Sequence, residues 1–191
     1  MNNPDTKAGW EEFDIEALSL NDLKEKYPDL IYSDWFKGEK FADEKAQPGR
    51  YEICFQHPDS TNKTYPRQLE SRPKDKNCGI PHIAVLVQGL ISYFVKTGER
   101  LLPNTYSRSS TSSDGCLVYA GDFNSDGLYV DYAYPGRSYA GLGVSFSRNL
   151  GTWPLKPRDK NGRFTGKPTV KVISSLATEI EFEGRKYVLK D

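Results

Sequence analysis

The stretch that decides the fold is PHIAVLVQGLISYFVKT, residues 81–97. Its apolar side chains recur with the period of one helical face, at Ile83, Leu86, Val87, Leu90, Ile91 and Phe94. Pro81 suits the first turn of a helix, where a backbone N–H would have no partner, and Gly98 suits the left-handed residue that ends one. The pattern predicts a helix over about 81–97.

The remaining positions of this helix show how much of it is buried. Gln88, Ser92 and Lys96 recur every four residues and predict a narrow polar face. Val85 and Val95 widen the apolar stripe, so we expect little of the helix to contact water. A helix of this kind organises a hydrophobic core around itself.

Strand patterns surround the helix. Alternating apolar and polar residues or short apolar runs predict strands at 50–56, 116–123, 128–134, 141–148 and 169–174, and a hairpin at 178–189. Asn124–Gly127 supplies turn chemistry for a second hairpin, whereas the Ser/Thr-rich segment 107–113 is typical of a loop. We therefore expect an α+β fold in which the buried helix packs on a mainly antiparallel sheet.

The N-terminal part is expected to be irregular. Residues 19–27 and 64–72 each suit a short helix, with Ser19 or Asn21 as the cap of the first and Thr64 as the cap of the second. Residues 1–18 are polar and acidic, and they indicate an arm that can be flexible. The predicted domains are this arm and a single α+β domain at 19–191.

Composition and charge give coarse bounds on function. The 191 residues are 37% hydrophobic and 27% charged, which is ordinary for a globular domain. The first 60 residues carry 14 acidic and 7 basic residues, and the remaining 131 carry 12 acidic and 19 basic ones. No apolar run reaches the length of a membrane span, and three widely spaced cysteines favour a reducing compartment. We expect a cytoplasmic protein that does not contact a membrane.

One candidate metal site is the segment 122–127, with Asp122, Asn124 and Asp126 ahead of Gly127. Alternating oxygen-bearing residues followed by glycine resemble the opening of an EF-hand calcium loop, because Ca²⁺ takes several hard oxygen ligands and glycine permits a sharp turn. The chain departs from that pattern at Ala133, where the bidentate glutamate would stand. The alternative is a polar hairpin turn without a metal.

A second candidate metal site uses cysteine and histidine. The residues Cys54, His57, Cys78 and His82 form two short pairs, which is a donor set that suits tetrahedral Zn²⁺. The alternative is that Cys54 belongs to a strand and that His82 lies in the first turn of the helix. No cofactor is predicted besides these two possible ions, Ca²⁺ and Zn²⁺.

The remaining candidate is a binding surface of tyrosine and basic residues. It draws on the strands at 116–148 and on a basic loop at 156–167, and its members are Tyr129, Arg137, Arg148, Lys156, Arg158, Lys160 and Arg163. Aromatic faces stack on bases or sugars, and basic side chains hold phosphates or carboxylates. A protein or a polyanion would suit such a surface, and nucleic acid is one alternative. In the other interpretation these tyrosines form core and sheet edges.

The sequence contains no motif that defines an enzyme. It has no Gly-x-Ser-x-Gly elbow, no phosphate-binding loop and no dinucleotide-binding glycine pattern. The first hypothesis is therefore a non-enzymatic binding or interaction protein that uses the 116–148 strands and the 156–167 loop. Metal binding and nucleic-acid binding through the basic C-terminal portion are the alternatives.

Overall fold

The computed structural model describes residues 9–55, 58–74, 77–151, 179–182 and 185–188. The chain divides into two compact units, residues 1–152 and 153–191. Whether residues 19–191 make up one domain stays a prediction. None of the described helices is both long and apolar enough to cross a lipid bilayer.

The described residues of the first unit contain two sheets. The first is antiparallel with the order β1-β2-β7, and its strands are Trp10–Ile15, Gly49–Cys54 and Phe146–Asn149. The second has the order β5-β4-β3-β6. Its strands are β3 Tyr106–Ser113, β4 Cys116–Asn124, β5 Gly127–Ala133 and β6 Leu142–Val144. Among the described pairings between named strands, only that of β3 with β6 is parallel, so the α+β fold with mainly antiparallel strands is confirmed.

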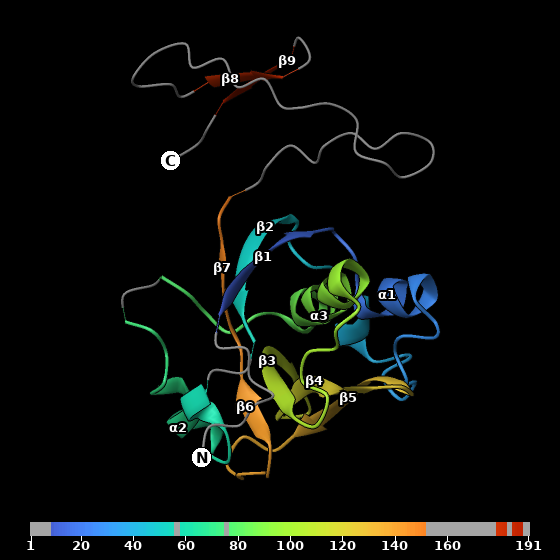
Figure 1. Cartoon of the computed structure of the whole chain (residues 1–191), viewed down its shortest axis with the longest axis vertical. Coiled ribbons are helices and arrows are strands. Elements are labelled where there is room, and N and C mark those ends of the chain that lie inside the picture. Colours follow the sequence, from blue (N-terminus) through green and yellow to red (C-terminus); the bar gives the residue numbers. More distant parts are fainter. Residues whose placement is uncertain (1–8, 56–57, 75–76, 152–178, 183–184, 189–191) are drawn as a thin grey trace. The chain divides into compact units, whose positions relative to one another are not determined.

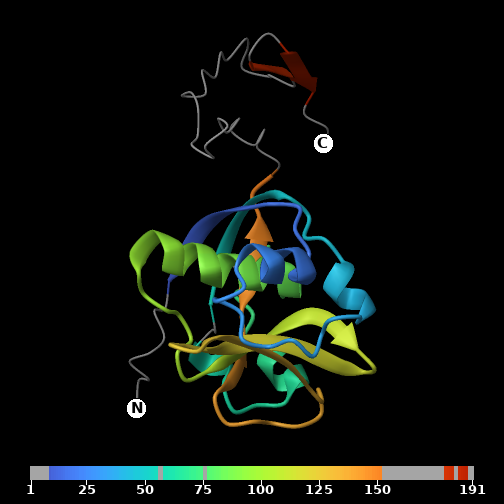
Figure 2. The same ribbon diagram turned by 90° about the vertical axis from the view of Figure 1, so that its right-hand side faces the viewer.

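The predicted central helix is α3, Ile83–Thr97, and it lies between the two sheets (Figures 1 and 2). It contacts β1 on one side and both β3 and β4 on the other. The prediction that Pro81 lies in the first turn is wrong, because His82 is the N-cap and the helix begins one residue later. Gly98 ends the helix in the left-handed region at φ 76°, as expected.

Two details of α3 differ from the expected pattern. Gln88 belongs to the predicted polar face but is buried, because it makes two hydrogen bonds with the backbone of Glu16 just after β1, at 2.9 and 3.0 Å. Those bonds satisfy the amide without water. Val95, in contrast, is 64% exposed, because the last turn of α3 extends beyond the sheets.

The two predicted short helices are present within the segments 19–27 and 64–72. α1 spans Leu20–Lys26 and begins with a capping box in which Ser19 and Asp22 exchange side-chain and backbone hydrogen bonds. α2 spans Tyr65–Leu69, and two short 3₁₀ helices span Lys40–Asp43 and Pro58–Ser60. Residues 10–15, expected in an arm, form β1 instead, because the alternation of Phe13 and Ile15 buries one face of that strand.

Segment 107–113 is a strand rather than the predicted loop. It lies within β3, and its inward serines are buried because each hydroxyl finds a close partner. The Ser107 hydroxyl bonds that of Ser145 at 2.7 Å, and the Ser109 hydroxyl donates to the carbonyl of Val118 at 2.8 Å. The predicted strand 141–148 is divided between β6 and β7, which join the two sheets.

The second unit contains one described hairpin. β8, Glu179–Phe182, pairs antiparallel with β9, Arg185–Val188, close to the predicted limits. Ile180 lies opposite Tyr187 and Glu181 lies opposite Lys186. The predicted strand 169–174 lies outside the described residues.

Candidate functional site: the tyrosine groove

The outer face of the four-stranded sheet, which is the face turned away from α3, carries a regular arrangement of side chains. Gly121 on β4 lies between Tyr106 on β3 and Tyr129 on β5 in one cross-strand row. In the next row, Tyr119 lies between Arg108 and Asp131. Residues that lie directly opposite on neighbouring strands share a face, so three tyrosines are gathered on this side of the sheet.

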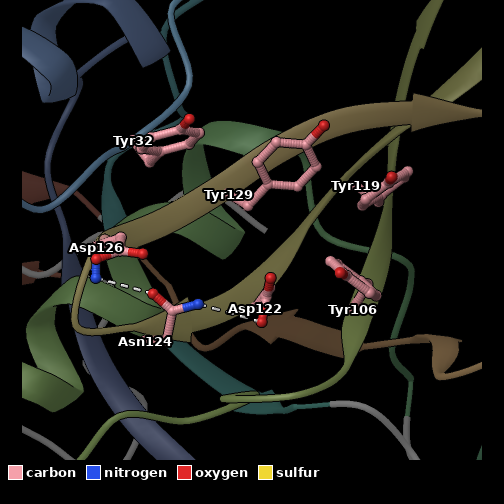
Figure 3. A pocket seen from close by; sticks show the side chains of 8 residues that line it. Tyr32, Tyr106, Tyr119, Asp122, Asn124, Asp126 and Tyr129 are labelled. Atoms are coloured by element: carbon pink, nitrogen blue, oxygen red, sulfur yellow. Dashed lines mark hydrogen bonds between the residues drawn. The ribbon is translucent and has the colours of Figure 1, made fainter.

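A half-open groove of about 550 Å³ lies over these rows (Figure 3). We call it the tyrosine groove, and its lining residues are Tyr32, Tyr106, Tyr119, Asp122, Asn124, Asp126, Gly127 and Tyr129. The volume is within the usual range for small-molecule sites. Among these described lining residues four are tyrosines, two are aspartates and none is basic.

The rings contact one another and form a connected aromatic wall. The ring centroids of Tyr106 and Tyr119 are 5.3 Å apart with an angle of 74° between the planes. Tyr129 lies 6.4 Å from Tyr106 and also 6.4 Å from Tyr32. The edge-to-face packing of Tyr106 against Tyr119 and Tyr129 restrains these rings, because the positive edge of one ring meets the negative face of the next.

Tyr32 reaches the groove from a distant segment of the chain. Its backbone N–H donates to the carbonyl of Leu128 at 2.9 Å, and the N–H of Leu128 donates to the carbonyl of Leu30 at 2.8 Å. The segment 30–33 therefore lies along the outer edge of β5. Further along that edge, the Ser33 hydroxyl accepts a hydrogen bond from the N–H of Val130, and the Trp35 indole donates one to the carbonyl of Val130.

A β-bulge directs the aspartate at position 122 into the groove. Val118 and Ala120 point inward, so strict alternation would also point Asp122 inward and Phe123 outward. The register of β4 with β5 shifts between Gly121 and Asn124, and Asp122 adopts a left-handed φ of 45°. As a result Phe123 is fully buried, and Asp122 lines the groove.

Gly121 makes this arrangement possible. A Cβ atom built at this position would lie 2.1 Å from the carbonyl oxygen of Thr105 and 2.6 Å from the Cα of Tyr106. Both are backbone atoms, one in β3 and one in the residue just before it, so no side-chain movement would relieve the overlap. Only glycine permits this close approach of β3 and β4 beneath the groove.

Burial and neighbouring carboxylates raise the pKa values of three tyrosines of the groove. The Tyr129 hydroxyl donates to Asp131 at 2.8 Å, and this bond, together with burial and the negative charge of Asp131, raises the pKa of Tyr129 to about 12. Burial and then the charge of Asp131 raise the pKa of Tyr119. Burial and the neighbouring Asp122 do the same for the pKa of Tyr106.

Arg108 supports the same sheet face from beneath α2. The residue is fully buried, and its guanidinium donates to the Gln68 side chain at 2.6 Å and to the carbonyls of Arg137 and Tyr134 at 2.9 and 3.3 Å. Its Nε has no hydrogen-bond partner among the residues that the structure describes. Burial lowers the pKa of Arg108 below its ordinary value. The side chain joins α2 and the turn after β5 to the sheet.

The three residues of the predicted calcium loop all line the tyrosine groove. Asp122, Asn124 and Asp126 lie on the β4–β5 hairpin, which is the turn that the sequence predicts. The Asn124 side chain accepts from the backbone N–H of Asp126 at 2.8 Å and donates to Asp122 at 3.4 Å (Figure 3). These bonds are those of a polar turn, and calcium binding stays a prediction.

The described members of the predicted zinc set do not meet. Cys54 lies on β2, which pairs with one edge of β7, whereas Cys78 precedes Gly79, which bridges Ser147 on the other edge of β7. The side chain of His82 caps α3 by accepting from the backbone N–H of residue 84 at 3.3 Å. Within the described ranges, no three Cys, His, Asp or Glu side chains are placed to hold a metal ion.

His57, the fourth member of that set, lies outside the described residues. Cys54 and Cys78 are both buried, and Cys78 packs with Val144 and Phe146 in a small apolar cluster. In the described part of the molecule these two thiols therefore lie in packed surroundings.

The predicted binding residues do not form one surface where they are described. Tyr129 lines the groove, and the Arg137 side chain is exposed on the turn after β5. Arg148 lies on β7 of the other sheet, where its Nε donates to Glu52 at 2.6 Å. The remaining members lie outside the described residues and are Lys156, Arg158, Lys160 and Arg163.

Sequence reasoning did not identify Tyr32, Tyr106 or Asp131 as part of a site. Tyr119 and Tyr129 are each followed two residues later by a small or acidic residue on the same face, Gly121 and Asp131. That alternation is visible in the sequence. The contribution of Tyr32 is not, because it depends on a pairing between segments almost a hundred residues apart.

A scan against protein-family models, a search of curated proteins and a search of solved structures each found no match to this chain. The geometry and chemistry of the tyrosine groove therefore carry the functional argument.

Proposed function

We propose that this chain is a non-enzymatic binding protein that receives a positively charged group in the tyrosine groove. The observation that carries the proposal is the composition of the described lining, in which four tyrosines and two aspartates stand beside Asn124 and Gly127 without a basic residue. Asp131, which bonds Tyr129, adds a further negative charge next to the wall.

Two physical effects favour a cation in such a groove. The face of an aromatic ring attracts a cation through its quadrupole, by about 0.5–1 kcal/mol where exposed and about 2 kcal/mol or more where water is excluded. Carboxylates add Coulomb attraction and accept hydrogen bonds from the cation. The same charges repel phosphates, so the groove gives no support to nucleic-acid binding on this face.

The raised phenol pKa values favour binding over catalysis. A tyrosine acts as a base or nucleophile only when it loses its proton, and the hydrogen bond to Asp131, burial and the charge of Asp131 make that loss harder for Tyr129 by raising its pKa. The groove can therefore present rings and acceptor oxygens without offering an activated nucleophile.

The proposal is tested by isothermal titration with two capped peptides, Gly-Lys-Gly-Arg-Gly and Gly-Glu-Gly-Asp-Gly. We expect the basic peptide to bind, to weaken as salt rises, and to lose affinity in the double variant Asp122→Asn plus Asp126→Asn. Asp114→Asn is the matched control, because Asp114 is an exposed residue in the turn at the other end of β4. Equal affinity for both peptides, or no binding by either, would contradict the proposal.

Calcium is the alternative cation, because two carboxylates and an amide of one hairpin line the groove. A ligand that binds only the folded state raises the melting temperature. If Ca²⁺ is the ligand, added CaCl₂ stabilises the wild-type protein and does not stabilise Asp122→Ala plus Asp126→Ala. An equal response of both proteins excludes the loop as a calcium site.

We further propose a cytoplasmic location. None of the three cysteines forms a disulfide, although all three lie within the described residues. Unlinked thiols are typical of proteins from reducing compartments. Alkylation of intact cells followed by mass spectrometry would show the in-cell state of the thiols, and a disulfide found there would contradict the proposal.

A further inference from the structure

We infer that the cation received by the tyrosine groove is the guanidinium group of an arginine side chain carried on a peptide. This inference rests on the proposed function and specifies the chemistry of the ligand. Three features of the groove lead to it: its remaining hydrogen-bonding capacity, the shape of its wall, and the closed edge of the neighbouring strand.

The groove offers mostly acceptors. The hydroxyl of Tyr129 donates to Asp131, and the negative charges of Asp122 and Asp131 act on Tyr106 and Tyr119 respectively. One N–H of Asn124 also donates to Asp122. A sugar hydroxyl needs both donors and acceptors, whereas a guanidinium has five N–H donors and no acceptor. The carboxylate oxygens of the lining therefore match a ligand that only donates hydrogen bonds.

The wall favours a planar cation over a spherical one. Tyr32 and Tyr129 are inclined by only 36° to each other, and the Tyr32 side chain is 64% exposed, so its ring surface is accessible. A guanidinium stacks flat on such a surface while its edge bonds a carboxylate in two places. Asp122 and Asp126 lie on the hairpin beside this wall and supply the carboxylates. An ammonium is a compact point charge and cannot make both contacts with one plane.

The ligand enters by its side chain rather than by adding a strand. The outward backbone groups of Leu128 and Val130 on β5 already bond residues 30–35, and the N–H of Tyr132 bonds the side chain of Asp131. A peptide that paired with this edge would have to displace those bonds. Free arginine fits less well than peptide arginine, because its α-carboxylate would meet the aspartates without a basic residue to receive it.

The test is a titration series with acetyl-Gly-X-Gly-amide peptides in which X is arginine, citrulline, lysine or trimethyllysine, together with free arginine. Citrulline is the neutral isostere of arginine. We expect the arginine peptide to bind tightest, with citrulline about tenfold weaker because its charge is absent. Tyr129→Ala should lose most of this preference. Tyr134→Ala is the control, since Tyr134 is an exposed tyrosine that does not line the groove.

Each outcome separates the inference from the proposal on which it rests. If lysine or trimethyllysine binds at least as tightly as arginine, the guanidinium inference is overturned and the proposed cation binding stands. If free arginine binds as tightly as the peptide, the peptide part of the inference is overturned. If citrulline equals arginine, or if no peptide binds, both the inference and the proposed function fail.

Discussion

The two faces of the β3–β4–β5 sheet are built from the same alternating strands but have different roles. The inner face presents small and branched apolar side chains to α3, among them Val118, Ala120 and Val130, all fully buried. The outer face presents Tyr119 and Tyr129 to an open groove. The inner face stabilises the fold through buried area, whereas the outer face leaves large aromatic groups accessible, which is what a binding site requires.

The inner face should be the most sensitive to substitution. Leu90 on α3 is fully buried between the sheets, so Leu90→Ala should lower the free energy of unfolding by about 2–5 kcal/mol. Urea unfolding followed by circular dichroism measures the change. Val95→Ala on the exposed last turn of the same helix is the control, and we expect a change within about 0.5 kcal/mol. An equal loss of unfolding free energy at both positions would show that Leu90 is not buried in the core between the two sheets.

The next largest effect is expected at Gly121, where β3 and β4 approach closely beneath the groove. Gly121→Ala places a methyl group against the backbone of β3, and we expect a loss of about 1–3 kcal/mol together with weaker ligand binding. Gly79→Ala is the matched control, because a Cβ there would have no neighbour within 4 Å. If the Gly121→Ala variant unfolds at the same urea concentration as the wild-type protein, β3 and β4 do not approach each other as closely as the structure shows.

A smaller effect is confined to the outer face and to alkaline pH. The pKa of Tyr129 is raised to about 12 in the folded protein, whereas the ordinary value is 10.0. A raised pKa means that the stabilising contribution is complete below about pH 10 and is lost as the pH rises through about 12. Tyr129→Phe should therefore show a shallower loss of stability across this window.

The measurement for that prediction is urea unfolding at several alkaline pH values. Ultraviolet titration of tyrosinate absorbance adds a second readout, since Asp131→Asn should bring the pKa of Tyr129 closer to 10.0. The conclusion would be contradicted if Asp131→Asn left the titration curve unchanged.

Sequence patterns predicted the parts of the fold that depend on local periodicity. The buried helix and the hairpin at Asn124–Gly127 are confirmed because each is determined by residues near to one another in the chain. The strand β3 was not predicted, because Ser107 and Ser109 have a polar composition and their burial depends on partners elsewhere. Gln88 is buried for the same kind of reason.

The candidate site was predicted in part. Tyr129 and the three polar residues of the hairpin were identified from the sequence, although as members of two different sites. What joins them is the bulge that turns Asp122 outward and the pairing that brings Tyr32 beside β5. Neither follows from residue type or spacing, because a bulge breaks the alternation on which strand prediction depends.

The most direct test of the central claim is nuclear magnetic resonance mapping of the ligand. Backbone and tyrosine-ring signals would be followed while acetyl-Gly-Arg-Gly-amide is added to isotope-labelled protein. We predict that the largest shifts fall on Tyr32, Tyr106 and Tyr129 and on the hairpin residues Asp122 and Asp126, with little change along α3. Shifts that cluster elsewhere, or no shifts at saturating peptide, would contradict the assignment of the tyrosine groove as the binding site.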